Sequence, residues 1–207
     1  MLSNKIYIVL LLAYSLIFFS CSGKKSNSDT KPAVDYENPQ VVLEKAKDII
    51  GPNVSFAYKG KFDQDTVIEI AAGSETQTSK AWGIKFILLK IDGAQLQTTF
   101  QTPLLNGSFK QCLVQKIKFP FFNHELIYYN SQDYFLGSGG GEVYSYIVDF
   151  DKRETFYAHL ITEPDKPVEL FLSNNIDISQ VKDFFVSVFK RDYPSLTVVS
   201  KDVVLKY

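Results

Sequence analysis

The spacing of apolar residues predicts a helix early in the chain. Apolar residues at positions 42, 46, 49 and 50 fall on one face of a helix. Asn38 is a good N-cap, Pro39 is tolerated at the first helical position, and Gly51-Pro52 is a typical stop. Together these features predict a helix over residues 39–50.

A second helix is predicted over residues 178–191. Its apolar stripe consists of Ile178, Val181, Phe184, Phe185 and Val188. Asp177 with Gln180 fits a capping box at its start, and Pro194 prevents its continuation. We expect the phenylalanine face of this helix to pack on a sheet.

Between the two helices, short β-rich runs recur at a spacing of about ten residues and are separated by turn residues. Asp92-Gly93 and Asn106-Gly107 are the clearest turns, and the pattern indicates antiparallel strands. The predicted strands cover residues 54–61, 66–72, 82–91, 94–102, 108–119, 125–130, 142–150, 154–162 and 167–172. A last strand, over residues 196–205, follows the second helix.

Polar and apolar residues alternate most clearly in the run GEVYSYIVDF, residues 141–150. One face carries Tyr144, Tyr146, Val148 and Phe150, and we predict that this face is buried. The opposite face carries Val143, Ser145, Ile147 and Asp149. The chain then turns at residues 151–153 and returns as a hairpin.

The predicted fold class is α+β and mostly β. It is an antiparallel β-meander of about 8–10 strands, with an N-terminal helix (39–50) and a C-terminal helix (178–191) packed on the sheet. We predict a leader over residues 1–20, a flexible polar tether over 21–37 and one globular domain over 38–207.

Composition supports a globular domain and argues against a nucleic-acid ligand. The 207 residues are 45% hydrophobic and 22% charged, so a core can be buried. The net charge is −1, and no basic block with interleaved aromatic residues occurs in the sequence.

The first twenty residues have the pattern of a targeting segment. Lys5 supplies a short positive region, and residues 6–20 are mostly apolar. A spanning helix needs about 20 apolar residues, and this run is shorter and interrupted by Ser15 and Ser20. We therefore predict a cleaved signal peptide, with an uncleaved N-terminal anchor as the alternative.

The stretch Phe18-Phe19-Ser20-Cys21 resembles the lipobox of bacterial lipoprotein precursors, with Phe18 where that family most often has Leu. The resemblance covers only the first two dozen residues. It implies cleavage after Ser20, a diacylglyceryl thioether on Cys21 and an acyl chain such as palmitate on the new amino group. Ser22, rather than Asp, after the cysteine implies the outer membrane. Two or three acyl chains hold a soluble domain firmly at a bilayer.

Once Cys21 carries lipid, Cys112 has no partner for an intramolecular disulfide. No feature around it indicates an activated thiolate. We predict that Cys112 points into a core as a small hydrophobic residue.

The most distinctive stretch is LGSGGGE, residues 136–142, which fits neither a Walker A loop nor the GxGxxG and GxSxG motifs. We interpret it first as a turn or bulge that needs positive φ. The second interpretation is a site where a ligand or partner approaches the backbone. The candidate binding loop consists of Tyr134, Phe135, Gly137, Ser138, Gly139, Gly140, Gly141 and Glu142.

No metal, cofactor or catalytic residue is predicted. Asp63, Asp65 and Glu69 resemble the start of a calcium loop but lack its later ligands, so a β-turn is preferred. His124 and His159 do not have zinc-site spacing, and a surface or hydrogen-bonded position is expected for His159. The acidic residues at 149, 151 and 154 lie at a hairpin mouth, which is normally solvated.

These features predict a lipid-anchored protein of the cell envelope, held at the outer membrane through the lipid on Cys21. Its β domain is expected to bind an envelope protein, a glycan or a small molecule. The alternative is an envelope hydrolase that uses carboxylates near Asp149–Glu154 or the loop at 137–141.

Overall fold

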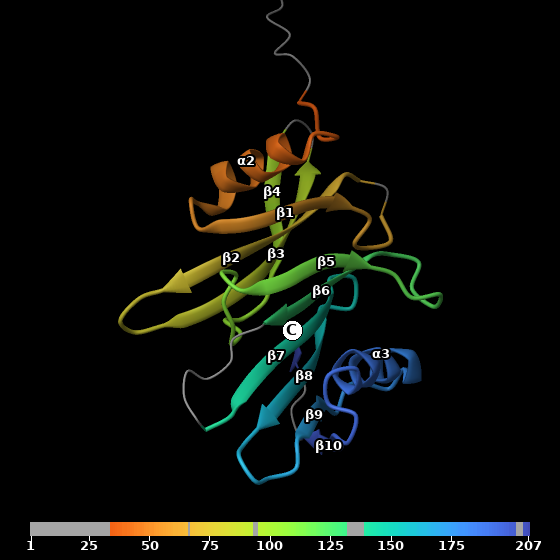
Figure 1. The fold of residues 1–207 in the computed structure, drawn as a ribbon. Coiled ribbons are helices and arrows are strands. Elements are labelled where there is room, and N and C mark those ends of the chain that lie inside the picture. Colours follow the sequence, from red (N-terminus) through yellow and green to blue (C-terminus); the bar gives the residue numbers. More distant parts are fainter. Residues whose placement is uncertain (1–33, 66, 93–94, 132–138, 202–204) are drawn as a thin grey trace, which may run out of the picture. The chain divides into compact units, whose positions relative to one another are not determined.

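The computed structural model describes residues 34–65, 67–92, 95–131, 139–201 and 205–207. Residues from Asp35 to Tyr207 belong to one structural unit. Its elements form four layers, which follow one another as helix, sheet, sheet and helix (Figure 1). The fold is α+β and mostly β, as the sequence predicts.

Sheet A is an antiparallel meander of four strands within the described residues, in the order β1-β2-β3-β4. Its strands are β1 (Val54–Gly60), β2 (Glu69–Gln77), β3 (Trp82–Asp92) and β4 (Gln95–Gln101). Helix α2 (Pro39–Ile50) covers one face of this sheet. Its bounds agree with the prediction, and the Asn38 side chain caps it by accepting the Gln40 N–H.

Sheet B has seven strands within the described residues, in the order β10-β9-β8-β7-β6-β5, with β11 paired to β8. These strands are β5 (Cys112–Ile117), β6 (Leu126–Ser131), β7 (Gly141–Asp149), β8 (Glu154–Thr162), β9 (Glu169–Ser173), β10 (Thr197–Lys201) and β11 (Leu205–Lys206). Helix α3 (Ser179–Lys190) packs on one face of the sheet, as expected.

The last strands differ from the predicted meander. The chain returns along α3 before it re-enters the sheet, so β10 runs parallel to β9 rather than antiparallel. The single strand predicted over residues 196–205 is two strands, β10 and β11, and residues 202–204 lie outside the described residues.

Three hydrophobic cores hold the layers together. The inter-sheet core lies between sheets A and B and includes Phe56, Phe86 and Tyr129. The α2 core joins α2 to sheet A through Val42 and Ile70, among others. The α3 core joins α3 to sheet B, with Phe185 fully buried among its residues.

Because sheet B lies between α3 and sheet A, both of its faces are buried, which corrects the prediction for β7. Tyr146 and Val148 belong to the inter-sheet core as expected. The opposite face is not solvated, because Val143 and Ile147 pack in the α3 core. Asp149 on that face is also fully buried.

The capping box predicted for the last helix is absent. The N-cap residue of α3 is Ile178, and its side chain makes no capping hydrogen bond. The helix is instead fixed by its apolar face, since Val181, Phe185 and Phe189 are all buried in the α3 core.

Candidate functional site

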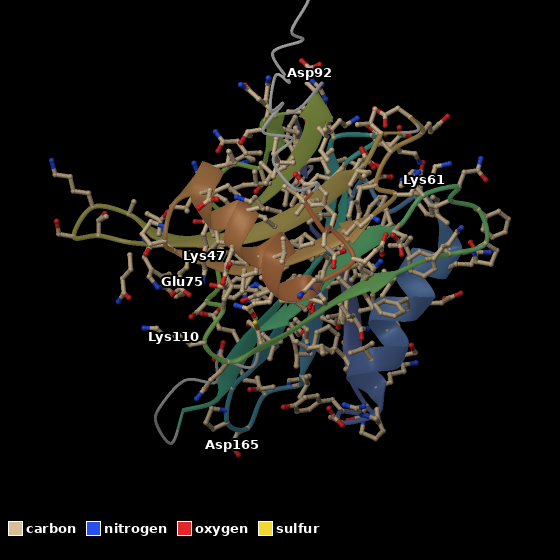
Figure 2. The ribbon with its side chains drawn as sticks, turned by 90° about the horizontal axis from the view of Figure 1, so that it is seen from above. Lys47, Lys61, Glu75, Asp92, Lys110 and Asp165 are labelled. Atoms are coloured by element: carbon tan, nitrogen blue, oxygen red, sulfur yellow. The ribbon has the colours of Figure 1, made fainter. Side chains whose placement is uncertain are left out.

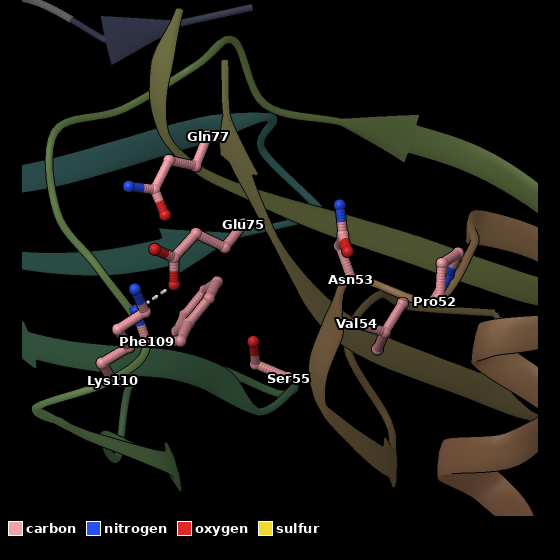
Figure 3. A pocket seen from close by; sticks show the side chains of 8 residues that line it. All are labelled: Pro52, Asn53, Val54, Ser55, Glu75, Gln77, Phe109 and Lys110. Atoms are coloured by element: carbon pink, nitrogen blue, oxygen red, sulfur yellow. Dashed lines mark hydrogen bonds between the residues drawn. The ribbon is translucent and has the colours of Figure 1, made fainter. Parts of the chain in front are cut away.

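An open cleft lies where β1 begins, beside the end of β2 (Figure 3). Its volume is about 470 Å³, within the range of small-molecule sites. Three segments far apart in the sequence line it: Pro52, Asn53, Val54 and Ser55 at β1; Glu75 and Gln77 on β2; Phe109 and Lys110 before β5. Figure 2 shows Glu75 and Lys110 on the same side of the unit.

Glu75 fixes one wall of the cleft. Its carboxylate accepts the backbone N–H of Phe109 at 2.9 Å, and both of its oxygens lie within 3.2 Å of Ser108 Oγ. These bonds tie the segment before β5 to the middle of β2. The Glu75 carboxylate therefore holds this segment in place and also lines the cleft, and a carboxylate can accept more hydrogen bonds than these three.

Phe109 supplies an apolar wall that is anchored from behind. Its ring makes edge-to-face contacts with Phe56, Phe86 and Tyr129, at centroid distances of 5.3, 5.9 and 5.6 Å. The residue is nevertheless half-buried, because one side of it lines the cleft. A ring held in this way presents a rigid apolar surface to a ligand.

The remaining polar side chains of the cleft are free to bind. Asn53, Ser55, Gln77 and Lys110 are exposed, and none of their side chains forms a hydrogen bond or ion pair with another described residue. The cleft thus offers two amides, one hydroxyl, one ammonium and one carboxylate.

The glycine-rich segment is described only in part. Tyr134, Phe135, Gly137 and Ser138 of the candidate binding loop lie outside the described residues. Gly140 has φ +113°, and a Cβ there would lie 1.9 Å from Thr162 O. This confirms the prediction of a turn that needs positive φ, with the exposed Gly139 before it and Gly141 starting β7.

Glu142, the last residue of that loop, joins a polar cluster on β7 and β8. Its Oε2 lies 2.6 Å from His159 Nε2 and accepts the Tyr144 hydroxyl at 2.9 Å. The Tyr144 ring stacks on the His159 ring at a centroid distance of 4.5 Å. Burial, reinforced by the Glu142 carboxylate, raises the pKa of Tyr144 to about 12. His159 is therefore hydrogen-bonded, one of the two positions expected for it.

The hairpin between β7 and β8 was expected to be solvated, but two of its acidic residues are buried. Asp149 is fully buried, and its Oδ1 lies 2.9 Å from Nε2 of the equally buried His124 and accepts the Lys152 N–H. Asp151 accepts a hydrogen bond from Gln64, and Glu154 is buried at the start of β8. The acidic residues hold the hairpin to neighbouring segments.

In the segment predicted as a β-turn, the Asp63 carboxylate accepts the Asp65 N–H and the Asp65 carboxylate accepts the Val67 N–H. The acidic residues of this segment lie around Lys90. The three carboxylates of Asp63, Asp65 and Glu69 come within 4.8 Å of one another. Lys90 forms ion pairs with all three, at 2.6 Å to Asp65 and 3.2 Å to Glu69. The lysine ammonium thus occupies the place at which a cation would bind.

Of the two cysteines, only Cys112 is among the described residues. Cys112 lies at the start of β5, forms no disulfide with another described residue and is half-buried against the inter-sheet core, which agrees with a packing role. Cys21, the predicted lipidation site, and the rest of the leader lie outside the described residues. In the part of the chain that the structure describes, no helix is long and apolar enough to cross a membrane.

Comparison with known proteins gives no match, either among protein-family models, among curated proteins or among solved structures. The sequence does not reveal the cleft, because its residues come from three separate segments. Ser-Glu-Thr-Gln at 74–77 and Phe109-Lys110 carry no motif, so only their meeting in space marks them as a site.

Proposed function

We propose that the protein is a lipid-anchored binding module of the cell envelope, held at the outer membrane by acyl chains on Cys21. The lipobox-like stretch and the polar residues after it support the anchor. The domain that follows holds its ligand, an envelope component or a small molecule, in the cleft beside Glu75.

The cleft is the single observation that carries the binding function. Polar side chains that have no partner among the described residues line the cleft together with an apolar wall that is fixed by the inter-sheet core. Such a combination orients a ligand through hydrogen bonds and gains affinity from the apolar contact. A preformed wall also lowers the ordering cost of binding.

A hydrolase is the second candidate, and one observation favours it. Glu142, at the end of the glycine-rich segment, pairs with His159, and a carboxylate that orients an imidazole is a common arrangement in general-base catalysis. The carboxylates of Asp149 and Glu154 are less suited to this role, because both are buried.

The anchor is tested by labelling cells with an alkyne analogue of palmitate and fractionating their membranes. We expect label on the wild-type protein and on Cys112→Ser, and a leader cleaved before residue 21. Cys21→Ser should lose the label and the cleavage. An intact leader, or an unmodified thiol at residue 21 in mass spectrometry of the native protein, would contradict the anchor.

Binding is tested by thermal unfolding of the purified full chain against soluble oligosaccharides, peptides and metabolites. A ligand at 100 times its dissociation constant adds about 2.7 kcal/mol to the free energy of unfolding. We expect hits that disappear in the Asn53→Ala/Gln77→Ala double variant. Turnover of a hit, lost in Glu142→Gln, would favour the hydrolase instead.

A further inference from the structure

Trp82, the only tryptophan of the chain, begins β3 next to the end of β2 that lines the cleft. It is directly opposite Gln77 in the antiparallel register of β2 and β3, so the two side chains share one face of sheet A. The next pair on that face is Glu75 with Ile84, and Ile84 belongs to the inter-sheet core. Trp82 is therefore the cross-strand neighbour of the cleft residue Gln77 on one face of sheet A.

The backbone that carries Trp82 is firmly held. Gly83 has φ +149°, and a Cβ there would lie 2.3 Å from Leu105 O. Ile84 and Leu105 exchange two backbone hydrogen bonds, at 2.8 and 2.9 Å. The start of β3 is thus held against the segment after β4, which fixes the backbone that carries the indole.

The indole is exposed although its backbone is fixed. Trp82 is 46% exposed, and its ring makes no aromatic contact with another described residue. Burying a tryptophan side chain is favourable, and this gain is only partly realised within the domain. A half-exposed tryptophan on a rigid strand can gain the rest by contact with a ligand. Phe109 and Trp82 provide two apolar surfaces, and Gln77, which also lines the cleft, is the cross-strand neighbour of Trp82.

The chemistry of this surface selects a class of ligand. The side chains without internal partners are mainly uncharged: two amides, one hydroxyl and the indole. One carboxylate and one ammonium, Glu75 and Lys110, balance each other in charge. An anionic polymer would need several cations here, because phosphate or sulfate recognition depends on clustered basic groups.

We propose that the cleft binds a neutral saccharide, with a pyranose ring stacked on Trp82 and its hydroxyl or acetamido groups bonded by Gln77, Asn53 and Glu75. Sugar rings combine an apolar C–H face with a rim of hydrogen-bonding groups, which matches an aromatic platform beside amides. The inference rests on the proposed binding function and names its ligand class.

The single tryptophan provides the measurement. The full lipidated chain, kept in dimethylamine-oxide detergent because glucoside and maltoside detergents would compete, is titrated with chitotetraose, cellotetraose and maltotetraose. We expect at least one of them to change the indole emission saturably. Calorimetry should show binding weakened at least tenfold in Gln77→Ala and at least fivefold in Trp82→Ala. Phe121→Ala, which removes another exposed aromatic residue, should bind as the wild type does.

The outcomes separate this inference from the function on which it rests. If a saccharide binds equally well to the wild type, Gln77→Ala and Trp82→Ala, the site assignment is overturned. If no saccharide binds, but a peptide or metabolite binds and is lost in Gln77→Ala, the saccharide is overturned and the binding module stands. If none of these ligands binds, both proposals are overturned. Far-ultraviolet circular dichroism must show that each variant is folded.

Discussion

The polar side chains of the cleft differ from the buried ionisable side chains near the β7–β8 hairpin in whether they have partners within the protein. Asn53, Ser55 and Gln77 are exposed and have no internal partner among the described residues. His124 and Asp149 are 4% and 0% exposed in their side chains and lie 2.9 Å apart. Histidine and aspartate are more common catalytic residues than asparagine, serine and glutamine. In this protein, however, His124 and Asp149 hold segments of the chain together.

This difference shows that the type of a residue is a weaker guide to function than whether its side chain already has a hydrogen-bond partner in the protein. A buried carboxylate hydrogen-bonded to a histidine ring links two segments, and removing one partner of such a pair is costly because the other stays buried. An exposed amide beside a rigid aromatic ring contributes little to the fold and is available for a ligand. Stability and binding should therefore respond to different substitutions.

The largest expected effect is loss of stability in Asp149→Ala. The substitution leaves His124 buried without its carboxylate and removes the acceptor of the Lys152 N–H. We expect the free energy of unfolding to fall by about 3–5 kcal/mol in urea titrations. Asp183→Asn, on an exposed position of α3, should change it by less than about 0.5 kcal/mol. Equal stability of the two variants would show that the buried pair does not hold the hairpin.

Lys90→Gln should have an intermediate effect that depends on pH. Burial alone would raise the pKa of Asp63, but the Lys90 ammonium and the Asp65 N–H hold it below its ordinary value. A lowered carboxyl pKa contributes stability at pH values above the unfolded pKa, and this contribution is lost as the pH falls through the folded pKa. We expect a loss of about 1–3 kcal/mol at pH 7 that shrinks as the pH falls below about 4.

The measurement is urea unfolding at several pH values between 7 and 3, with the exposed Lys80→Gln as the matched control. A difference between wild type and Lys90→Gln that stays constant over this range would mean that the carboxylates do not account for the effect of the lysine.

The smallest effect on stability is expected in the cleft. Gln77→Ala removes an exposed amide that has no described partner, so the free energy of unfolding should change by less than about 0.5 kcal/mol. The same variant is the one expected to lose ligand most strongly. A destabilisation of several kcal/mol would mean that Gln77 stabilises the fold. The difference between the cleft side chains and the buried His124–Asp149 pair would then not hold.

The sequence predicts those elements whose ends carry local signals. Helix α2 matches its prediction because Asn38 and Gly51-Pro52 fix both ends within a few residues. Strand β8 also matches, with bounds Glu154–Thr162. Strand β2 was predicted too early, at 66–72, because Asp65 accepts the Val67 N–H and delays the strand to Glu69. Its polar end, through Gln77, does not resemble a strand in sequence.

Features that depend on tertiary contacts could not be predicted. Asp149 is expected at a solvated hairpin mouth, but it is buried and its Oδ1 lies 2.9 Å from His124 Nε2; Ser145, on the same face of β7, bonds to Asn130. The site predicted from the sequence differs from the cleft for a related reason. The glycine-rich run predicts a binding loop near residues 136–142, whereas the cleft depends on the register of β2 with β3 and on the Glu75 bond to Phe109.

The arrangement of two sheets between two helices has a consequence for local opening. Each helix covers one outer face through its own core, so either one can detach while the inter-sheet core stays closed. Amide hydrogens of α2 and α3 should then exchange with solvent through separate fluctuations. Those of β3 and β7, which have a neighbouring strand on each side and a packed layer above and below, should exchange only when the whole domain unfolds.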